Sequence, residues 1–194
     1  APCTDQSSDC DNNASTDVVT DKLTGLMWPK NGNLAGYMNW YSAIDYANNL
    51  DLCGHSDWHL PNINEIESLV NADVPDSAPW LNSQGFTSVV SDFYWSSTTI
   101  PNRTSYAWMV DMWNGYEGFD GSAYKSYSHV VWPVRGGQSG GGVIQLHQTG
   151  QTKCYDIYGS EMACTGTGQD GEIQAGVAWP SPRFTDNSNE IIMD

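Results

Sequence analysis

The sequence predicts an α+β fold in which two short helices precede a tryptophan-rich antiparallel sheet. Nine Trp and ten Tyr among 194 residues are too many aromatic residues for a disordered chain. Charged residues make up only 15% of the chain, and glycine occupies 19 positions, which favours short strands and turns over long amphipathic helices. Two segments with helical spacing come first, and strand-like segments follow. The length suffices for one good core, or for one domain and a smaller partner.

The N-terminal part predicts a polar arm and then a hairpin. Residues 1–17 are rich in aspartate, and we expect order there only where a disulfide holds the chain. The stretch "VVTDKLTGLMW" predicts a strand, a turn from Asp21 to Gly25 and a second short strand.

Two helices are predicted next. The first follows Asn39 as N-cap and has apolar residues at helical spacing, namely Trp40, Ala43, Ile44 and Ala47. In "LPNINEIESLVN", Asn62 is a good N-cap and Glu65 completes a capping box. The apolar face of this second helix is Ile63, Ile66, Leu69 and Val70.

The C-terminal part is predicted to consist of strands and an extension. From Val74 onward the helical spacing disappears, and "FYWSSTT", "SYAWMVDMW" and "SHVVWPVRGG" alternate or run apolar, as expected of antiparallel strands. Residues 18–137 would form one domain, and the Gly-rich residues 138–142 a flexible linker. Residues 143–194 contain one predicted strand, "VIQL", and too few apolar residues for a core of their own.

The five cysteines are expected to form two short disulfide loops. Cys3 and Cys10 are close neighbours in the sequence, and so are Cys154 and Cys164. Such loops are typical of an oxidising compartment, and a reduced chain with scattered thiols is the alternative. Cys53 is left over and is expected to be a free, buried thiol.

The charge of the chain disfavours several classes of partner. A formal net charge of −16 repels nucleic acid and anionic membrane surfaces. No apolar run approaches the ~20 residues that cross a bilayer, so the chain is not expected to span a membrane. The opening "APC" is typical of a mature chain after a small-residue cleavage site. Together with the cysteines it predicts a secreted or cell-surface protein.

Several longer stretches resemble a known family. "TDKLTGLMW", "GHSDWHLPNINEIESLV", "YWSST", "AWMVDM" and "VVWPVRGG" occur in the order found in the Lcl-type C-terminal domain, which is named after the Legionella collagen-like adhesin. The resemblance covers residues 18–137. It implies a C-type lectin-like fold on secreted or surface proteins, and binding or adhesion more often than catalysis. One departure is His59, where the family usually has Arg in a "DWRLP" element.

The extension resembles the leader that precedes such modules in longer bacterial chains, in "GQTKCYD", "CTGTGQDGE" and "PRFTDN". The order here is therefore body first and leader last, and one full module would be residues 148–194 followed by 18–137. The end of the chain also matches its beginning, because residues 186–194 align without gaps on residues 13–21. We therefore expect the chain to be cut inside a repeat.

The densest polar stretch, "GHSDWHLPN", has two interpretations. Asp57, His55 and His59 could form an acid–base or metal cluster. Alternatively, Asp57 accepts backbone N–H groups in a buried turn while Trp58 fills the core, and the resemblance favours this turn. Nucleophile motifs such as G-x-S-x-G are absent, and Cys53 alone does not supply the cysteine pair of the related formylglycine-generating enzymes. The chain is not expected to be an enzyme.

No cofactor is implied by these patterns, but Ca²⁺ is a candidate. Sugar-binding C-type lectins hold Ca²⁺ with Glu-Pro-Asn or Gln-Pro-Asp and with Trp-Asn-Asp, where this chain has "LPN" and "WNG". The missing carboxylates matter because Ca²⁺ needs several charged oxygen ligands. A different calcium site could form in the arm from Asp9, Asp11 and Asp17, and a solvated acidic loop is the alternative.

The best candidate ligand loop is residues 111–129. It holds Trp113, Tyr116, Phe119 and Tyr124 between glycines, so not all of these rings can be core. They could bind a glycan or a protein, or instead pack beneath the loop or at a subunit contact. Sulfated glycosaminoglycans fit badly, because seven Lys and Arg stand against 23 Asp and Glu.

The predicted function is that of an exported structural or adhesive protein that associates with copies of itself. Residues 143–194 would extend to a neighbouring copy, with Ile191, Ile192 and Met193 as an added edge strand. Head-to-tail contacts of this kind grow into a filament unless they close into a ring. The alternatives are an extension that folds back on its own body, a surface module that binds a glycan or protein through residues 111–129, and an enzyme.

Overall fold

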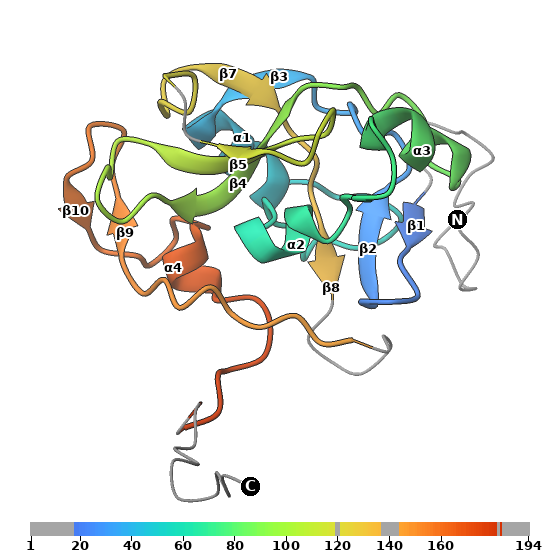
Figure 1. Ribbon diagram of the computed structural model, residues 1–194. Helices are drawn as coiled ribbons and strands as arrows, with labels where there is room; N and C mark the ends of the chain where they lie inside the picture. Colours follow the sequence, from blue (N-terminus) through green and yellow to red (C-terminus); the bar gives the residue numbers. More distant parts are fainter. Residues whose placement is uncertain (1–17, 119–120, 137–143, 182, 184–194) are drawn as a thin grey trace, which may run out of the picture.

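In the computed structural model, the described residues are 18–118, 121–136, 144–181 and 183. They form a mixed α+β architecture of short helices around small sheets, with the extension packed along one side (Figure 1). This confirms the predicted α+β class. The C-type lectin-like fold stays a prediction.

The first sheet starts with the predicted hairpin. β1 (Val18–Thr20) pairs antiparallel with β2 (Leu26–Pro29). The carboxylate of Asp21 accepts two hydrogen bonds within the turn, and Gly25 adopts a φ of 76°, which glycine reaches without strain. β8 (Arg135–Gly136) pairs with the other edge of β2, so strands from both ends of the domain meet in one sheet.

Both predicted helices form, and they begin at the predicted caps. α1 (Trp40–Asn48) follows Asn39, and its buried face consists of the four residues that the pattern indicated. α2 (Ile63–Glu67) follows Asn62, and the capping box between Asn62 and Glu65 is complete. An N-cap of this kind stabilises a helix by about 1 kcal/mol. α2 is shorter than its apolar pattern, whose last residues belong to the following turn.

The central sheet has five strands in the order β3-β7-β4-β5-β6. They are β3 (Tyr37–Asn39), β4 (Phe93–Thr99), β5 (Ala107–Asp111), β6 (Glu117–Gly118) and β7 (Ser128–Val130). The pairing is antiparallel except between β4 and β7, which run parallel where Tyr94 faces Val130. The expectation of a purely antiparallel sheet is wrong at this pair, because the chain after β6 crosses to the far side of β4 instead of continuing the meander.

One helix of the domain lies where the sequence pattern indicated only strands. α3 (Ser77–Ser83) follows Asp76, whose side chain accepts the backbone N–H of Ala78 at 3.0 Å. Its buried residues are Ser77, Ala78 and Leu81. Two turns are too short to show the repeated spacing on which a helix prediction rests.

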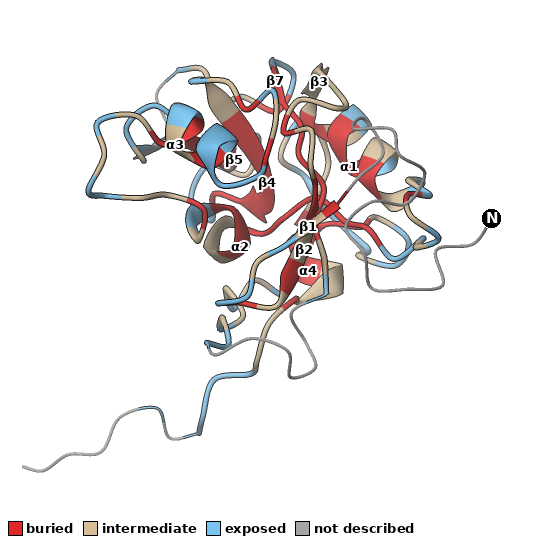
Figure 2. Cartoon of the chain, turned by 90° about the vertical axis from the view of Figure 1, so that its right-hand side faces the viewer, coloured by how far each residue is buried: buried red, intermediate tan, exposed pale blue. Residues whose placement is uncertain are grey.

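The central sheet is buried on both faces. Consecutive residues of β4 point to opposite sides, so Tyr94 packs with Val110 and Trp132, whereas Trp95 packs with Met109. Residues of α2 and α3 complete the first cluster and residues of α1 the second, and Figure 2 shows buried residues concentrated between them. A strand with two buried faces has no polar alternation, which accounts for the apolar run before Ser96.

The extension is a small unit closed by a disulfide. β9 (Cys154–Tyr155) and β10 (Glu161–Met162) form a two-stranded hairpin, and the one-turn helix α4 (Asp170–Ile173) follows. The predicted disulfide between Cys154 and Cys164 is confirmed. The strand predicted from "VIQL" is wrong for residues 144–146, which are irregular. Their backbone runs along the domain instead of pairing in a sheet.

The described part of the extension folds back on its own domain. The hydroxyl of Tyr41 in α1 donates to the carbonyl oxygen of Tyr155. The side-chain amide of Asn62 donates to the carbonyl oxygen of Ala175 at 3.2 Å. Figure 1 shows this segment lying below the central sheet and beside α2. The extension lacks a core, and it gains one by packing on the domain.

This packing corrects the predicted assembly. Residues 143–194 were expected to dock on a neighbouring copy, and that expectation is wrong for residues 144–181, which contact their own domain. Ile191, Ile192 and Met193, the predicted assembly strand, lie outside the described residues, as does the predicted linker.

The expectation that Cys53 is a free thiol is wrong, because Cys53 is disulfide-bonded. Its partner lies outside the described residues, and since Cys154 bonds Cys164, the sequence leaves Cys3 and Cys10 as candidates. The predicted Cys3–Cys10 pair also lies outside the described residues. Sequence separation alone suggested that pair, whereas in the fold Cys53 packs against the cluster that contains Val18, the residue that follows the arm.

Peptide mapping under non-reducing conditions tests this connection. We expect Cys53 to be recovered in a disulfide with a peptide from residues 1–17, and Cys154 with Cys164. Alkylation of Cys53 in the folded, unreduced protein would contradict the bridge.

Candidate functional site

The turn between β5 and β6, residues 111–116, is held by a dense set of hydrogen bonds. The backbone N–H of Asp111 donates to the carbonyl oxygen of Tyr116 at 3.0 Å, and that of Gly115 donates to the carbonyl oxygen of Asp111 at 2.8 Å. The carboxylate of Asp111 accepts the N–H of Trp113, and the side chain of Asn114 accepts that of Tyr116, each at 2.9 Å. These bonds fix the backbone that carries the aromatic side chains of Trp113 and Tyr116.

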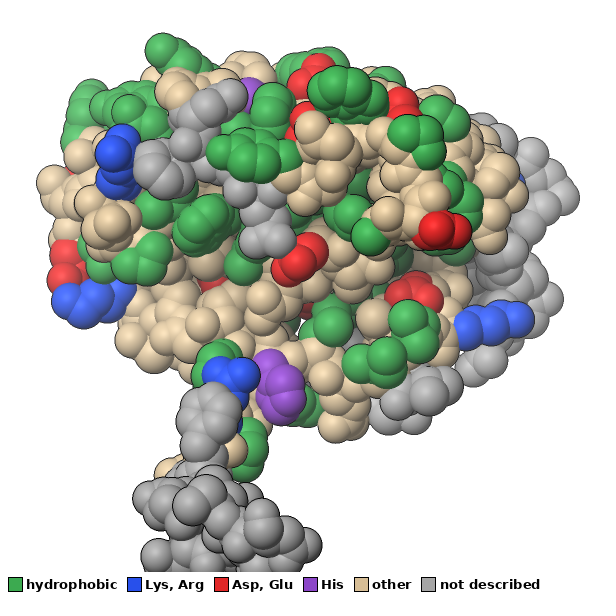
Figure 3. Space-filling view, in the orientation of Figure 1, with side chains coloured by type: hydrophobic (Ala, Val, Ile, Leu, Met, Phe, Trp, Pro, Cys, Tyr) green, Lys and Arg blue, Asp and Glu red, His purple; other side chains and the backbone are tan. Residues whose placement is uncertain are grey.

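Two of the four predicted ligand residues are exposed on this turn. Trp113 is 56% exposed and Tyr116 is 51% exposed. Tyr124 instead packs edge-on against Tyr106, with ring centroids 5.0 Å apart, and Phe119 lies outside the described residues. On the face drawn in Figure 3, hydrophobic side chains gather over the upper half, where the central sheet lies. The turn is therefore a rigid carrier of two solvent-facing rings.

The stretch "GHSDWHLPN" does not bring Asp57 and His59 into one cluster. Arg135 donates to both carboxylate oxygens of Asp57, at 2.6 and 2.9 Å. This bond to Arg135, which outweighs partial burial, holds the pKa of Asp57 below its ordinary value. Trp58 fills the core as expected. The expectation that Asp57 serves a buried turn is wrong, because its exposed carboxylate is used to bind Arg135.

His59 forms a buried pair with Glu65. Its Nε2 lies 3.1 Å from Oε2 of Glu65. Burial by itself lowers the pKa of His59, but the facing carboxylate of Glu65 and that of Asp170 outweigh it, so the pKa is raised. The pair therefore stabilises the fold fully below the ordinary histidine pKa and loses this contribution as the pH rises through the raised value. At this position the family usually has Arg, which stays charged. His59 can instead lose its charge as the pH rises.

Asp170 connects the extension to the domain. One of its carboxylate oxygens accepts the hydroxyl of Thr98 on β4 and the hydroxyl of Thr149 in the extension, each at 2.7 Å. Only 1% of Asp170 is exposed. Burial raises the pKa of Asp170, and the two hydroxyl bonds oppose this shift.

Lys125 is a second charged group buried at this junction. Its Nζ donates to Oγ1 of Thr99 at 2.9 Å. It lies 3.9 Å from the centroid of the Trp40 ring and 5.8 Å from that of Tyr155 in the extension. Burial lowers the pKa of Lys125 to about 7, against the attraction of Asp156. Near neutral pH, a large part of this amine is therefore uncharged.

A calcium site is not found in the described part of the chain. Among these residues, no group of three or more His, Cys, Asp or Glu side chains could hold a metal ion. The candidate ligands Asp9, Asp11 and Asp17 lie outside the described residues, so calcium binding by the arm stays a prediction.

Residues 17–135 match the model of the Lcl C-terminal domain. This segment is more than half of the chain and includes the turn at residues 111–116 and the His59–Glu65 pair. The chain belongs to the Lcl C-terminal domain family. The family is of a non-enzymatic, adhesin type, so residues 17–135 are a surface-adhesin type of domain. No curated protein matches the chain.

Within the described ranges, no helix of this Lcl C-terminal domain protein or its extension has the length and hydrophobicity to cross a membrane.

Sequence reasoning missed Asp170 and Lys125. Asp170 stands in the Gly-rich "TGTGQDGE", where a lone Asp is typical of a turn. Lys125 is one of only seven basic residues, and it lies between Tyr124 and Tyr127. These neighbouring tyrosines were the only feature of the sequence that could have indicated a buried lysine amine here.

Replacing Lys125 with Met should remove a pH dependence of stability. The unfolded chain keeps the lysine proton up to pH 10.5, whereas the folded chain releases it at about 7. Between these values the unfolded state binds more protons, so the free energy of unfolding rises with pH. Urea unfolding at pH 7 and pH 10 should show a rise from this group of roughly 3–4 kcal/mol, which disappears in Lys125→Met.

Lys153→Met is the matched control, because the side chain of Lys153 is 57% exposed. It should keep the wild-type rise. His59 acts in the opposite direction but is present in all three proteins, so the difference between them isolates Lys125. A Lys125→Met protein with the full wild-type rise would show that another group is responsible.

Proposed function

We propose that the chain is a secreted or cell-surface adhesion module that binds a partner through the turn at residues 111–116. The observation that carries this proposal is the rigid display of Trp113 and Tyr116, both more than half exposed. Rings on a fixed backbone lose little conformational entropy when a partner covers them. The family match supports adhesion, and the disulfides support an oxidising, extracellular location.

The partner is expected to be a protein or a glycan without strong negative charge. Trp and Tyr are enriched at the energetic centres of protein interfaces, and their flat faces also stack on sugars. A net charge of −16 opposes anionic partners such as sulfated glycans.

A double substitution tests the turn. Trp113→Ala with Tyr116→Ala should weaken binding at least about tenfold, because the two rings are the proposed anchors. The measurement uses the full chain against immobilised panels of extracellular proteins and neutral glycans. The panel that gives the signal identifies the class of partner.

Tyr158→Ala is the matched control for this experiment. Tyr158 is 82% exposed but lies in the extension, so its loss should leave binding unchanged. Equal loss in both variants, or no loss in the double variant, would rule out the turn as the binding surface.

A second candidate function is self-association through the C-terminal segment. Two observations favour it. β1 is the outer strand of its sheet in the described part of the chain, and residues 186–194 are similar to residues 13–21, which include β1. Ile191, Ile192 and Met193 of one copy could pair with such an edge in the next copy, and repetition of this contact would form a filament.

The contact between residues 144–181 and the domain decides where to cut the chain for this test. Truncation after Arg183 removes the proposed strand and keeps the packed extension, whereas a cut after Gly142 would also remove the packed part. We expect the shortened protein to be a monomer by light scattering and the full chain to be an oligomer.

A pair of aspartate substitutions at neighbouring positions supplies the control for self-association. Ile192→Asp should abolish the oligomer, because a buried, unpaired carboxylate is costly. Asn189→Asp adds the same charge at a position with no proposed apolar contact and should not. If the truncated and full-length chains form assemblies with the same number of copies, residues 184–194 do not join one copy to the next.

A further inference from the structure

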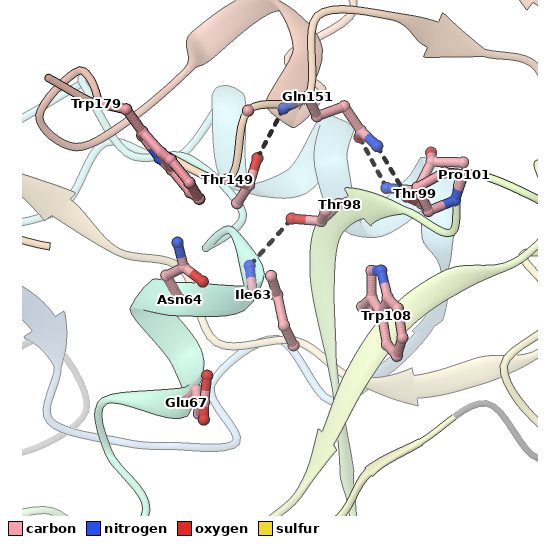
Figure 4. Close-up of a pocket in the computed structure, with 11 residues that line it drawn as sticks. Ile63, Asn64, Glu67, Thr98, Thr99, Pro101, Trp108, Thr149, Gln151 and Trp179 are labelled. Carbon is pink, nitrogen blue, oxygen red and sulfur yellow. Dashed lines mark hydrogen bonds between the residues drawn. The ribbon is translucent and has the colours of Figure 1, made fainter. Parts of the chain in front are cut away.

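A cleft with a volume of about 370 Å³ opens where the extension meets the domain. Its lining comes from α2, from the ends of β4 and β5, and from the extension. Figure 4 shows Trp179 of the extension on one side of the cleft and Trp108 of β5 on the other, with Asn64 of α2 below Trp179 in this view. The volume is at the lower end of the range of about 300–1,000 Å³ that is typical of small-molecule sites.

The walls of the cleft are held in place by hydrogen bonds. The backbone N–H of Thr99 donates to Oε1 of Gln151, and Nε2 of Gln151 donates back to the carbonyl oxygen of Thr99, both at 2.8 Å. The amide of Asn64 donates to the carbonyl oxygen of His147, also at 2.8 Å. The backbone edge at Thr99 is thus occupied, which disfavours a peptide that binds by adding a strand.

Trp179 is anchored although it is 44% exposed. Its indole N–H donates to the carbonyl oxygen of Gln148, and the guanidinium of Arg183 stacks over its ring at 3.5 Å from the centroid. A ring held in this way is pre-organised for stacking against a flat ligand.

Two polar groups that line the cleft, the indole N–H of Trp108 and Oδ1 of Asn64, have no hydrogen-bond partner within the described residues. Glu67 adds a carboxylate to the lining. One donor and several acceptors near two indole rings suit a ligand with hydroxyl groups on an apolar face.

We propose that this cleft is a binding site for a neutral saccharide. The hydroxyls would donate to Asn64 and Glu67 and accept from Trp108, while the C–H face of a sugar ring packs on Trp179. An acidic sugar is disfavoured by the carboxylate of Glu67 and by the net charge of −16. This site is separate from the turn at residues 111–116 and does not depend on the function proposed for it.

The test is a titration of the full chain with neutral monosaccharides and disaccharides, and with glucuronic acid as the anionic comparison. Saturation-transfer NMR detects binding, and the indole N–H resonances report the site. We expect a neutral saccharide to bind, to shift the Trp108 indole N–H, and to bind Trp179→Ala at least about fivefold more weakly than wild type. Trp179→Phe keeps a smaller ring and should fall between the two.

Tyr158→Ala is the matched control, since it removes an exposed aromatic ring of the extension that does not line the cleft and should leave saccharide binding unchanged. The effect of the Trp113 and Tyr116 substitutions in the adhesion assay tests the proposed function separately. The saccharide site is refuted if no neutral sugar binds, if glucuronic acid binds as tightly as the neutral sugars, or if both Trp179 variants bind like wild type.

Discussion

The carboxylate of Asp170 is the contact on which the rest of the structure depends. It accepts one hydroxyl from the domain, on Thr98, and one from the extension, on Thr149. A buried carboxylate is costly unless such partners satisfy it, and the hydroxyl of Thr98 is available to Asp170 only while the extension is docked. The same docking buries Lys125 near Tyr155 and forms the cleft between Trp108 and Trp179. The polar groups at this junction thus make the two parts of the chain interdependent.

The features that could be predicted from the sequence are local ones. Asn62 and Glu65 lie three residues apart, and their capping box follows directly from the helix start that they signal. The Cys154–Cys164 loop is equally local. The parallel pairing of β4 with β7 and the bridge from Cys53 join distant segments. The spacing of residues within a short segment carries no information on such contacts, because they depend on how distant elements pack together in the fold.

The two candidate sites also differ in this way: one is local in the sequence, and the other joins distant segments. Trp113 and Tyr116 belong to one short turn, and the glycines between the aromatic residues of this loop predicted that not all of its rings could be core. The cleft proposed as a saccharide site combines residues from α2, β4, β5 and the extension, and its two indole rings, Trp108 and Trp179, are 71 positions apart in the sequence. From the sequence, the extension was expected to leave its own domain, so a cleft between the two could not be predicted.

The side chain of Gln151 has a consequence for how molecules of this protein meet one another. Among the described residues, the backbone of β7 pairs with that of β4 only where Tyr94 faces Val130, so the later part of β4 has a backbone edge without a neighbouring strand. At Thr99 the carboxamide of Gln151 occupies that edge with both its donor and its acceptor, as a strand would. Open sheet edges are templates for uncontrolled association between molecules. This edge of the protein is therefore closed to identical neighbours, while the turn proposed as the binding surface stays exposed.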